Sequence, residues 1–517
     1  MMDRRQALKT LALLGGLGLG GASFRIDAKG RPEPERLALP EGFDEIDHFD
    51  VTHKLRDGGR FPIPAPSLRK DVVIVGGGIS GLTALHRLGE FDALLVEKEG
   101  EVGGNSRRRQ SRGIHYPLGA IVSQGAVAPF TDFFHELAVP FERIEGTHLA
   151  YHVDGRLVAD PLGAGWQKLP FTRKEREGFR HAGQDLAAYL RPKEGIFFPR
   201  TDNKPAIRQL DRISLKQHLD GKAYPGPVNH FLNLLLSSRL GEGGDNISAW
   251  TGLYVLSTLM APAYTLPGGH GAIAEILRDR CLKARPGSVL TGFTVVNVQN
   301  RPDGKVWVTG ILADGSAQTI EARCAVMAVP KVYAKHAVQG LMQDRAETLG
   351  HFHYNAYLVA QVELSKRLAP AFEIASANRF SRFIVAADWL KDNRDPKGSS
   401  HLTVYVPYSG VAGRVELYGA SPKDLAARIV ADLHAIVPGS PGAIERIHLN
   451  RWGHPMVSCA PGMDAIVDAA KQPFGNIVFA HSDSFGICGL YSAVWTGMEA
   501  SGDARIILED PANAPKT

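Results

Sequence analysis

A glycine-rich turn between two apolar runs is the feature of this sequence that most clearly predicts chemistry. Gly76, Gly78 and Gly81 form a G-x-G-x-x-G pattern directly after the apolar run Val72–Val75. In a strand-turn-helix unit, such glycines allow a tight turn, a close approach of backbone amides to a pyrophosphate, and close helix packing. Glu97 closes the next apolar run, where a carboxylate accepts hydrogen bonds from a ribose diol. The segment therefore predicts a dinucleotide site.

The composition is that of an ordinary soluble globular protein with more than one domain. The chain has 517 residues, of which 44% are hydrophobic and 22% are charged, and its formal net charge is +5. Much of the positive charge lies in residues 1–30, and no basic patch alternates with aromatic residues. We therefore expect no nucleic-acid partner.

The first thirty residues predict an export signal. Asp3-Arg4-Arg5-Gln6-Ala7-Leu8-Lys9 resembles a twin-arginine motif, and the apolar run Leu11–Leu19 after it is too short for an ordinary membrane helix. A chance Arg-Arg pair before an apolar segment is the alternative. We expect a periplasmic protein exported by the twin-arginine route, with no membrane span after the signal and a tightly held cofactor.

The four cysteines predict neither a zinc site nor a c-type haem. Cys281, Cys324, Cys459 and Cys488 form no C-x-x-C pattern, and no other metal site is expected. We expect buried free thiols, with disulfides as the alternative in oxidising surroundings.

The elements that position these residues follow from the hydrophobic periodicity. Residues 31–69 are rich in proline and charge and predict an extended arm, in which the segment His53–Gly58 fits no known motif. Residues from about 131 to 262 predict helices, and strands dominate from about 289 to 329. Beyond them we expect strands at Tyr357–Leu364, Leu402–Val406 and Asn476–Ala480, and helices at Pro422–Ile436 and Ser492–Ile507.

Taken in order, these motifs resemble the flavin-containing amine oxidoreductase superfamily, which includes monoamine and polyamine oxidases, phytoene desaturases and protoporphyrinogen oxidases. The resemblance covers roughly 71–508 and adds to the first turn the segments Gly103-Gly104, Gly113–Ala120, Pro267–Gly269, Ala328–Pro330 and His481–Asp483. It implies non-covalent FAD and an α/β fold, in which a Rossmann-like FAD-binding domain is interleaved with an α+β substrate domain. The implied division is a signal at 1–30, an arm at 31–69, FAD-binding segments at 71–130, 265–335 and 470–510, and substrate-domain segments at 131–264 and 336–469.

The resemblance also implies which residues hold the cofactor. Gly119 and Ala120 would lie beside the flavin ring, Val295 would bond adenine through its backbone, and Asp483 would meet the ribityl and phosphate end. A solvated basic loop is the alternative for Ser106 and Arg107, and ordinary strand core is the alternative for Val295. The full expected set is Gly76, Gly78, Ile79, Ser80, Gly81, Glu97, Lys98, Gly103, Gly104, Asn105, Ser106, Arg107, Gly119, Ala120, Val295, Asp483, Tyr491 and Ser492.

The residues that would face the flavin depart from the family pattern. The aromatic cage of the amine oxidases would fall near Pro455 and Gly489, and neither residue is aromatic. Trp452 and Tyr491 lie near these positions and would rebuild part of a cage. The flavin-facing lysine of the superfamily would match Lys335, one residue from His336, and His481 occupies the usual place of a small residue. The expected catalytic set is His454, His481, Lys335, Trp452 and Tyr491.

The reaction that we expect is dehydrogenation of a small-molecule amine or polyamine by hydride transfer to flavin, with a histidine or water taking a proton. One alternative is a desaturase or oxidase of an isoprenoid-like or porphyrin-like substrate. A second alternative is a non-catalytic FAD-binding partner in an exported complex. The electron acceptor stays open between oxygen and a quinone or cytochrome.

Overall fold

A seven-stranded sheet carries the glycine-rich turn in the computed structural model, which describes residues 39, 42–46, 48–124, 130–190 and 204–509. Its strands run in the order β11-β3-β2-β14-β13-β12, and β20 pairs with the end of β14. The predicted export signal at 1–30 lies outside the described residues. The strand bounds are β2 (Leu68–Val75), β3 (Ala93–Val96), β11 (Val289–Leu290), β12 (Phe293–Asn300), β13 (Val306–Leu312), β14 (Ala317–Met327) and β20 (Ile477–Phe479).

The central strand β2 is buried on both faces, which explains its uninterrupted apolar sequence. Val72 and Ile74 belong to one hydrophobic core with helices α3, α10 and α16, whereas Val73 and Val75 belong to another core with α11, α12 and α15. Strands β3 and β14 both pair with β2 in parallel, so their carboxyl ends meet at one edge. The turn from β2 into α3 lies at this edge, where ligands of open α/β sheets bind.

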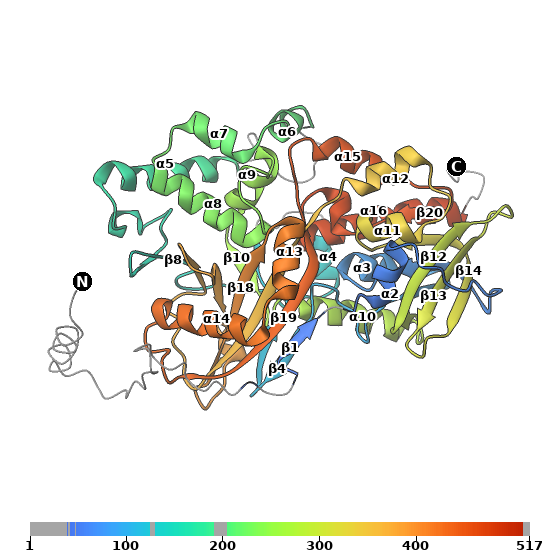
Figure 1. The fold of residues 1–517 in the computed structure, drawn as a ribbon, viewed down its shortest axis with the longest axis horizontal. Helices are drawn as coiled ribbons and strands as arrows, with labels where there is room; N and C mark the ends of the chain where they lie inside the picture. The colour runs from blue at the N-terminus through green and yellow to red at the C-terminus, as the bar shows by residue number, and fades with distance from the viewer. Residues whose placement is uncertain (1–38, 40–41, 47, 125–129, 191–203, 510–517) are drawn as a thin grey trace. The chain divides into compact units, whose positions relative to one another are not determined.

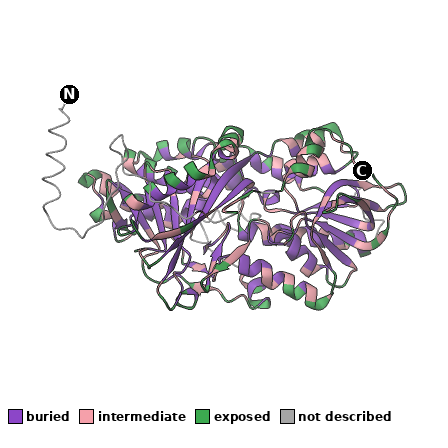
Figure 2. Cartoon of the chain, turned by 60° about the horizontal axis from the view of Figure 1, so that its bottom comes forward, coloured by how far each residue is buried: buried purple, intermediate pink, exposed green. Residues whose placement is uncertain are grey.

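A second large sheet of the described chain has eight strands, in the order β1-β19-β15-β18-β17-β16-β8-β9. Every residue of its central strand β15 is buried, and β15 pairs with β18 and β19 in antiparallel fashion. Figure 2 shows both sheets largely in the colour of buried residues. The strand bounds are β1 (Asp44–Ile46), β8 (Leu149–Val153), β9 (Arg156–Ala159), β15 (Tyr354–Leu364), β16 (Glu373–Ser376), β17 (Phe383–Ala386), β18 (Ser400–Tyr408) and β19 (Ile444–Val457).

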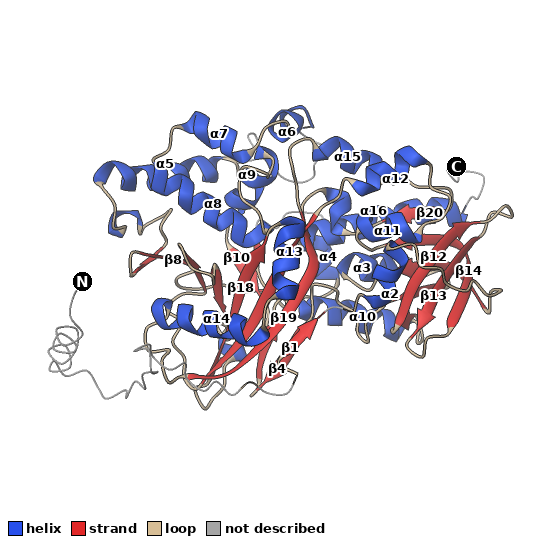
Figure 3. Ribbon diagram, viewed as in Figure 1, coloured by secondary structure: helices blue, strands red, loops and turns tan. Residues whose placement is uncertain are grey.

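Helices flank both sheets, as Figures 1 and 3 show. Helices α5, α8 and α9 share one core with strands β8, β16 and β17 of the eight-stranded sheet. The bounds are α2 (Asp50–Arg56), α3 (Ile79–Arg87), α4 (Phe130–Glu136), α5 (Arg173–Ala188), α6 (Lys204–Asp211), α7 (Leu215–Lys222), α8 (Gly226–Leu240), α9 (Ala249–Thr258), α10 (Gly271–Ala284), α11 (Lys331–Ala337), α12 (Gln343–Gly350), α13 (Gly410–Gly419), α14 (Pro422–Ile436), α15 (Met463–Ala470) and α16 (Leu490–Glu509).

The described part of the segment 31–69 is not simply the extended arm that its composition predicts, because it includes a strand and a helix. Strand β1 adds to the edge of the eight-stranded sheet, where the Asp44 carboxylate accepts a hydrogen bond from Arg451 at 2.8 Å. Helix α2 follows it and includes the His53–Arg56 part of the segment that fits no motif. A seven-residue helix is too short to show helical periodicity, and contacts with α11 and β12 stabilise it instead.

The helical prediction for 131–262 is also incomplete. Besides the expected helices, this stretch contributes β8 and β9 to the eight-stranded sheet. It also supplies β7 to a small three-stranded sheet in the order β6-β10-β7, whose other two strands lie just outside this stretch. These strands contain only two to five residues, too few for a reliable alternation of apolar and polar side chains. The bounds are β6 (Ser123–Gln124), β7 (Glu142–Arg143) and β10 (Ala263–Thr265).

The cysteines behave as expected. Cys281, Cys324 and Cys459 are buried free thiols, and Cys488 is a partly buried free thiol. Within the described ranges, no cluster of histidine, cysteine and acidic side chains has the composition of a metal site. The helices of the same ranges include none with the length and apolar character needed to cross a membrane.

Candidate functional site

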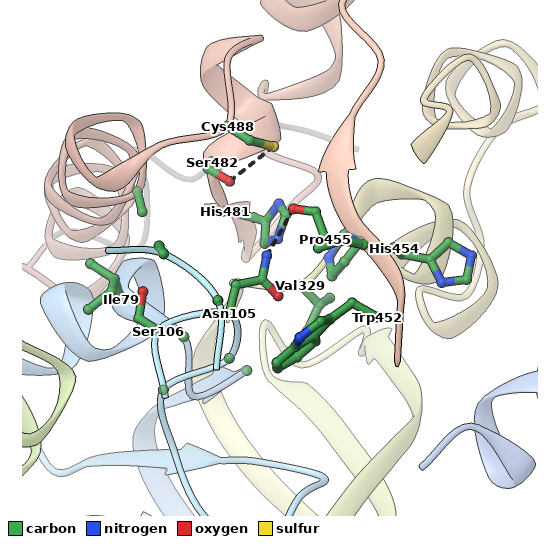
Figure 4. A pocket seen from close by; sticks show the side chains of 18 of the residues that line it. Ile79, Asn105, Ser106, Val329, Trp452, His454, Pro455, His481, Ser482 and Cys488 are labelled. Carbon is green, nitrogen blue, oxygen red and sulfur yellow. Dashed lines mark hydrogen bonds between the residues drawn. The ribbon is translucent and has the colours of Figure 1, made fainter. Parts of the chain in front are cut away.

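A cavity of about 550 Å³ is bordered by residues of both sheets. One end lies at the β2–α3 turn, and the other end is walled by strands of the eight-stranded sheet. Figure 4 shows the middle of the cavity, where Ile79 and Ser106 lie on one side and Trp452 and Val329 lie below His481. We call the two parts the dinucleotide end and the chamber end.

The turn between β2 and α3 forms a cradle in which side chains have no room. Gly76 has φ +108°, and a Cβ on it would lie 2.5 Å from the carbonyl oxygen of Ala328. A Cβ on Gly81 would lie 2.0 Å from the carbonyl oxygen of Gly76. Because Gly78 gives helix α3 no side-chain cap, the first N–H groups of the helix are available to an anionic group.

Glu97 lies at the end of β3 and is tied to the same turn. Its carboxylate accepts hydrogen bonds from the N–H of Gly77 at 2.6 Å and from the N–H of Glu99 at 2.9 Å. Burial raises the pKa of Glu97, and these backbone hydrogen bonds oppose the rise. Gly103 donates its N–H to the carbonyl oxygen of Gly77 at 2.7 Å, which holds the second glycine pair against the first turn.

Most of the predicted site residues border this cavity. The Arg107 side chain is only 14% exposed and its guanidinium lies 4.7 Å from the centre of the Trp452 ring, so Arg107 does not belong to a solvated loop. Val295 is both strand core and cavity wall, and its carbonyl oxygen accepts a hydrogen bond from Tyr333. The predicted residues on the wall are Gly76, Gly78, Ile79, Ser80, Glu97, Lys98, Gly103, Gly104, Asn105, Ser106, Arg107, Gly119, Ala120, Val295, Trp452, His454 and His481.

The structure does not place Lys335 at the flavin-facing position that the family pattern predicts. Lys335 does not border the cavity, and its Nζ lies against α12, where a Cβ on Gly350 would be 2.9 Å away. The neighbouring His336 does border the cavity. Helix α11 starts directly after Pro330. The sequence alone does not show which residues of this helix face the cavity.

Two further predictions, for Tyr491 and Ser492, require correction. Tyr491 turns away from the cavity wall and packs against the ring of Phe130, with ring centroids 5.1 Å apart, so it does not rebuild a cage. Ser492 is buried inside the first turn of α16. Gly81 packs closely against the turn, as the glycine pattern predicts, and does not itself border the cavity.

The Asp483 carboxylate belongs to a buried hydrogen-bond network and does not border the cavity. It accepts hydrogen bonds from Lys331 Nζ at 2.7 Å and from the Tyr354 hydroxyl at 2.5 Å. Lys331 Nζ also donates to the hydroxyl of Ser484 at 2.6 Å, and both Lys331 and Asp483 are fully buried. Because Lys331 starts α11 and Tyr354 starts β15, the network joins the two sheets. Sequence reasoning missed Lys331, and Asp483 holds this network instead of the ribityl chain.

His481 is held in a strained backbone conformation at the cavity wall. Its φ of +78° and ψ of 144° lie in a region that glycine occupies readily and other residues avoid. The hydroxyl of Ser80 accepts its N–H at 2.9 Å, and its Nδ1 lies 3.0 Å from the Asp483 carboxylate. Burial would raise the pKa of Asp483, but His481 and Lys331 lower it below its usual range. An ionised carboxylate therefore orients this imidazole.

His454 borders the cavity in an environment that disfavours positive charge. Burial, followed by the nearby cations Arg414 and His53, lowers its pKa to about 3. His53 and Arg56 reach the cavity from α2, which no sequence signal linked to a site. A neutral His454 is a weaker proton acceptor than its residue type predicts.

The chamber end is walled by aromatic side chains that are far apart in the sequence. Tyr357, Phe383 and Tyr405 border it from three strands. The Tyr405 hydroxyl donates to the carbonyl oxygen of Gly119 at 2.6 Å, and Trp452 Nε1 donates to that of Leu118 at 2.9 Å. Tyr405 and Trp452 therefore contact the segment Leu118-Gly119, which is expected to lie beside the flavin ring.

A family model described as flavin containing amine oxidoreductase matches residues 78–504. The chain belongs to this family. The match includes both ends of the cavity, and it makes the protein an FAD-dependent oxidoreductase.

Individual relatives of this flavin oxidoreductase are distant. Oxidoreductase PigB of Serratia sp. is 24% identical over 88% of this chain and 79% of that protein. Cyclohexylamine oxidase from Brevibacterium oxydans superposes with a TM-score of 0.67 at 17% identity, over 85% of this chain and 100% of that chain. Wild-type putrescine oxidase bound to putrescine gives 0.65 at 19%, over 85% of this chain and 99% of that chain. These likenesses show the amine oxidase fold.

The residues of the cavity fit FAD. The glycine cradle and the start of α3 suit its pyrophosphate, and Glu97 suits the adenosine ribose. A Cβ on Gly119 would lie 2.3 Å from the carbonyl oxygen of Asn105, so this segment also stays free of a side chain. FAD held here supplies the two-electron acceptor for a hydride, and the protein supplies position, burial and charge.

Proposed function

We propose that this FAD-dependent oxidoreductase dehydrogenates amines, removing a hydride from the C–H bond beside the amine nitrogen. The observation that carries the proposal is a cavity of about 550 Å³ that runs from the glycine cradle to an aromatic chamber, in a chain of the flavin containing amine oxidoreductase family. In this reaction the substrate nitrogen first loses its proton and keeps a lone pair. That lone pair stabilises the carbon as the hydride leaves.

His481 is the group that takes the proton in this proposal. Its Nδ1 accepts the backbone N–H of Asp483 at 3.3 Å and lies 3.0 Å from the Asp483 carboxylate, so Nε2 is the ring nitrogen left for the cavity. A bound ammonium gives one proton to Nε2, the neutral amine then loses hydride, and the resulting iminium is released to water for hydrolysis. Histidine is the residue type best suited to exchange a proton near neutral pH.

Two proteins with the same fold support the amine assignment, because their names state amine substrates. Putrescine oxidase and cyclohexylamine oxidase share the architecture of this chain over 85% of its length. We extend the amine chemistry of those two proteins to this chain as part of the proposal.

One observation favours a second candidate, a desaturase or oxidase of an apolar substrate. Pro455 and Gly489 border the cavity where amine oxidases of the family place aromatic side chains. The walls at Val359 and Met456 are apolar as well. An isoprenoid-like substrate would suit such a surface.

A substrate panel distinguishes these candidates. The purified yellow protein is mixed anaerobically with monoamines, diamines, polyamines and isoprenoids, and loss of the flavin absorbance is followed, with dithionite as the control reductant. We expect bleaching by amines. Bleaching by isoprenoids alone would favour the second candidate, and resistance to every organic substrate would favour a non-catalytic partner. Reoxidation by air or by a quinone then identifies the electron acceptor.

We also propose export by the twin-arginine route, on the strength of Arg4-Arg5 and the apolar run after it. Replacing both arginines with lysine, followed by cell fractionation, tests this. We expect the wild-type protein in the periplasm and the variant in the cytoplasm. An unchanged distribution would contradict export by this route.

A further inference from the structure

A buried ion pair lies at the chamber end of the cavity. Arg239 Nη2, from the last turn of α8, donates to Glu373 Oε2, from the start of β16, at 2.8 Å. Both residues border the cavity, beside Phe383 and Tyr405. The guanidinium lies 4.6 Å from the centre of the Phe383 ring, so the pair is held between an aromatic wall and the sheet.

The pair is neutral as a unit. Glu373 is fully buried, and the Arg239 side chain is 15% exposed. Burial would raise the pKa of Glu373, but Arg239 and then His148 lower it, so the carboxylate stays ionised beside the guanidinium. His148 Nε2 lies 3.3 Å from the same oxygen, Oε2.

Each partner keeps one buried polar atom that bonds nothing in the described chain. These atoms are Arg239 Nη1, a donor, and Glu373 Oε1, an acceptor. Buried polar groups are almost always hydrogen-bonded, because an unmet donor or acceptor in a protein interior is costly. Neither atom is exposed to solvent, but both residues border the cavity, so a ligand in the chamber is the nearest source of the missing partners.

We propose that Arg239 and Glu373 bind the end of the substrate that is distal to the reacting C–H bond, and that this end is an uncharged group able to accept and donate hydrogen bonds, such as a primary amide. The proposal rests on the proposed function, in which the other end of the same molecule is oxidised. The carbonyl oxygen accepts from Nη1, and the amide N–H donates to Oε1, while the ion pair stays intact.

A charged distal end does not fit. An ammonium would compete with Arg239 for the carboxylate, and a carboxylate would compete with Glu373 for the guanidinium. Either event leaves a buried charge without its partner, which is strongly unfavourable. Among the described wall residues, the other carboxylates are Glu97, Glu99 and Glu101, which belong to the dinucleotide end. The chamber therefore selects monoamines with a neutral polar tail over diamines.

Binding of tail probes that the enzyme does not oxidise tests this directly. Hexanamide, hexanoate and hexyltrimethylammonium are titrated into the holoenzyme, and perturbation of the flavin spectrum gives each Kd. We expect hexanamide to bind at least about tenfold more tightly than either ion. Equal affinities, or tighter binding of an ion, would overturn the proposal.

Two variants should change which probe binds most tightly, one in favour of the anion and the other in favour of the cation. Glu373→Gln leaves a cationic Arg239 and should favour hexanoate, whereas Arg239→Gln leaves an anionic Glu373 and should favour hexyltrimethylammonium. Glu445→Gln, which removes an ion pair with Arg112 away from the cavity wall, is the matched control and should keep the wild-type order. Unchanged preferences in both pair variants would overturn the proposal.

The same holoenzyme separates this inference from the proposed function. If no amine bleaches the flavin but hexanamide binds preferentially, the amine reaction fails and the polar subsite stands. If amines bleach the flavin and diamines react as fast as 6-aminohexanamide, the reaction stands and the subsite fails. Where a variant does not fold, the wild-type probe series alone decides.

Discussion

The two ends of the cavity are built in different ways. The dinucleotide end consists of glycines and backbone groups that lie close together in the sequence, between Gly76 and Arg107. The chamber end consists of side chains from separate elements, including Arg239 of α8, Glu373 of β16 and Tyr405 of β18. The cradle of backbone atoms tolerates few substitutions, because an added side chain would collide with it. The wall of side chains, in contrast, changes its shape and charge with each substitution. Family membership therefore determines the cofactor here without determining the substrate.

The largest effect should come from filling the cradle. In Gly81→Ala, the new Cβ would overlap the carbonyl oxygen of Gly76, 2.0 Å away, so the turn must move. We expect FAD to bind at least about 100-fold more weakly, measured by fluorescence titration of the apoprotein. Gly100→Ala, near the same turn but with no atom within 4 Å of its Cβ, is the matched control. Equal FAD affinities in the two variants would show that the cradle is not the cofactor site.

The buried network that joins the two sheets should give the next largest effect. Lys331→Met removes the buried ammonium that pairs with the Asp483 carboxylate, so the free energy of unfolding should fall by about 3–5 kcal/mol. Lys335→Met, four residues further along α11, should change it by less than about 0.5 kcal/mol. Urea unfolding of both variants checks this. Similar losses would mean that Lys335 has the buried role.

His481 lies between the two ends and should affect turnover more than stability. His481→Gly removes the proton acceptor and the positive-φ strain, so turnover should fall about 100-fold while the free energy of unfolding rises by about 1 kcal/mol. Steady-state kinetics and urea unfolding measure the two quantities. Asn378→Gly, at another positive-φ residue that does not border the cavity, should stabilise the protein without changing turnover. Full turnover in His481→Gly would remove His481 from the mechanism.

The smallest effect should appear as a pH dependence at His454. Its folded pKa of about 3 lies below the ordinary value of 6.5, so below pH 6.5 the unfolded chain binds a proton that the folded chain does not. The wild-type protein should therefore lose stability as the pH falls from 6.5 towards 3. Between pH 7.5 and 5, His454→Gln should gain up to about 2 kcal/mol relative to wild type in urea unfolding. A pH-independent difference would contradict the lowered pKa.

The sequence predicts the dinucleotide end well because its signals are local. The run from β2 through α3 to Glu97 is continuous in the sequence, and each residue type follows from backbone geometry. The long central strand β15 and helix α14 are likewise recognisable, since their apolar patterns extend over many residues.

The chamber end cannot be predicted from the sequence, because its residues come into contact only in the folded chain. Arg239 and Glu373 are 134 residues apart, and neither lies in a motif. Spacing after Pro330 points to Lys335, next to His336, and only the folded chain shows that Lys331 contacts Asp483. Helix α2 is too short to show a period, yet it brings His53 to the cavity.

The central claim is hydride removal from an amine by this FAD-dependent protein. The most direct measurement is anaerobic stopped-flow reduction of the holoenzyme by a monoamine, compared with the same amine deuterated at the carbon beside nitrogen. The account predicts complete bleaching, with slower bleaching by the deuterated amine. Flavin that stays oxidised with every amine, yet bleaches with dithionite, would contradict it.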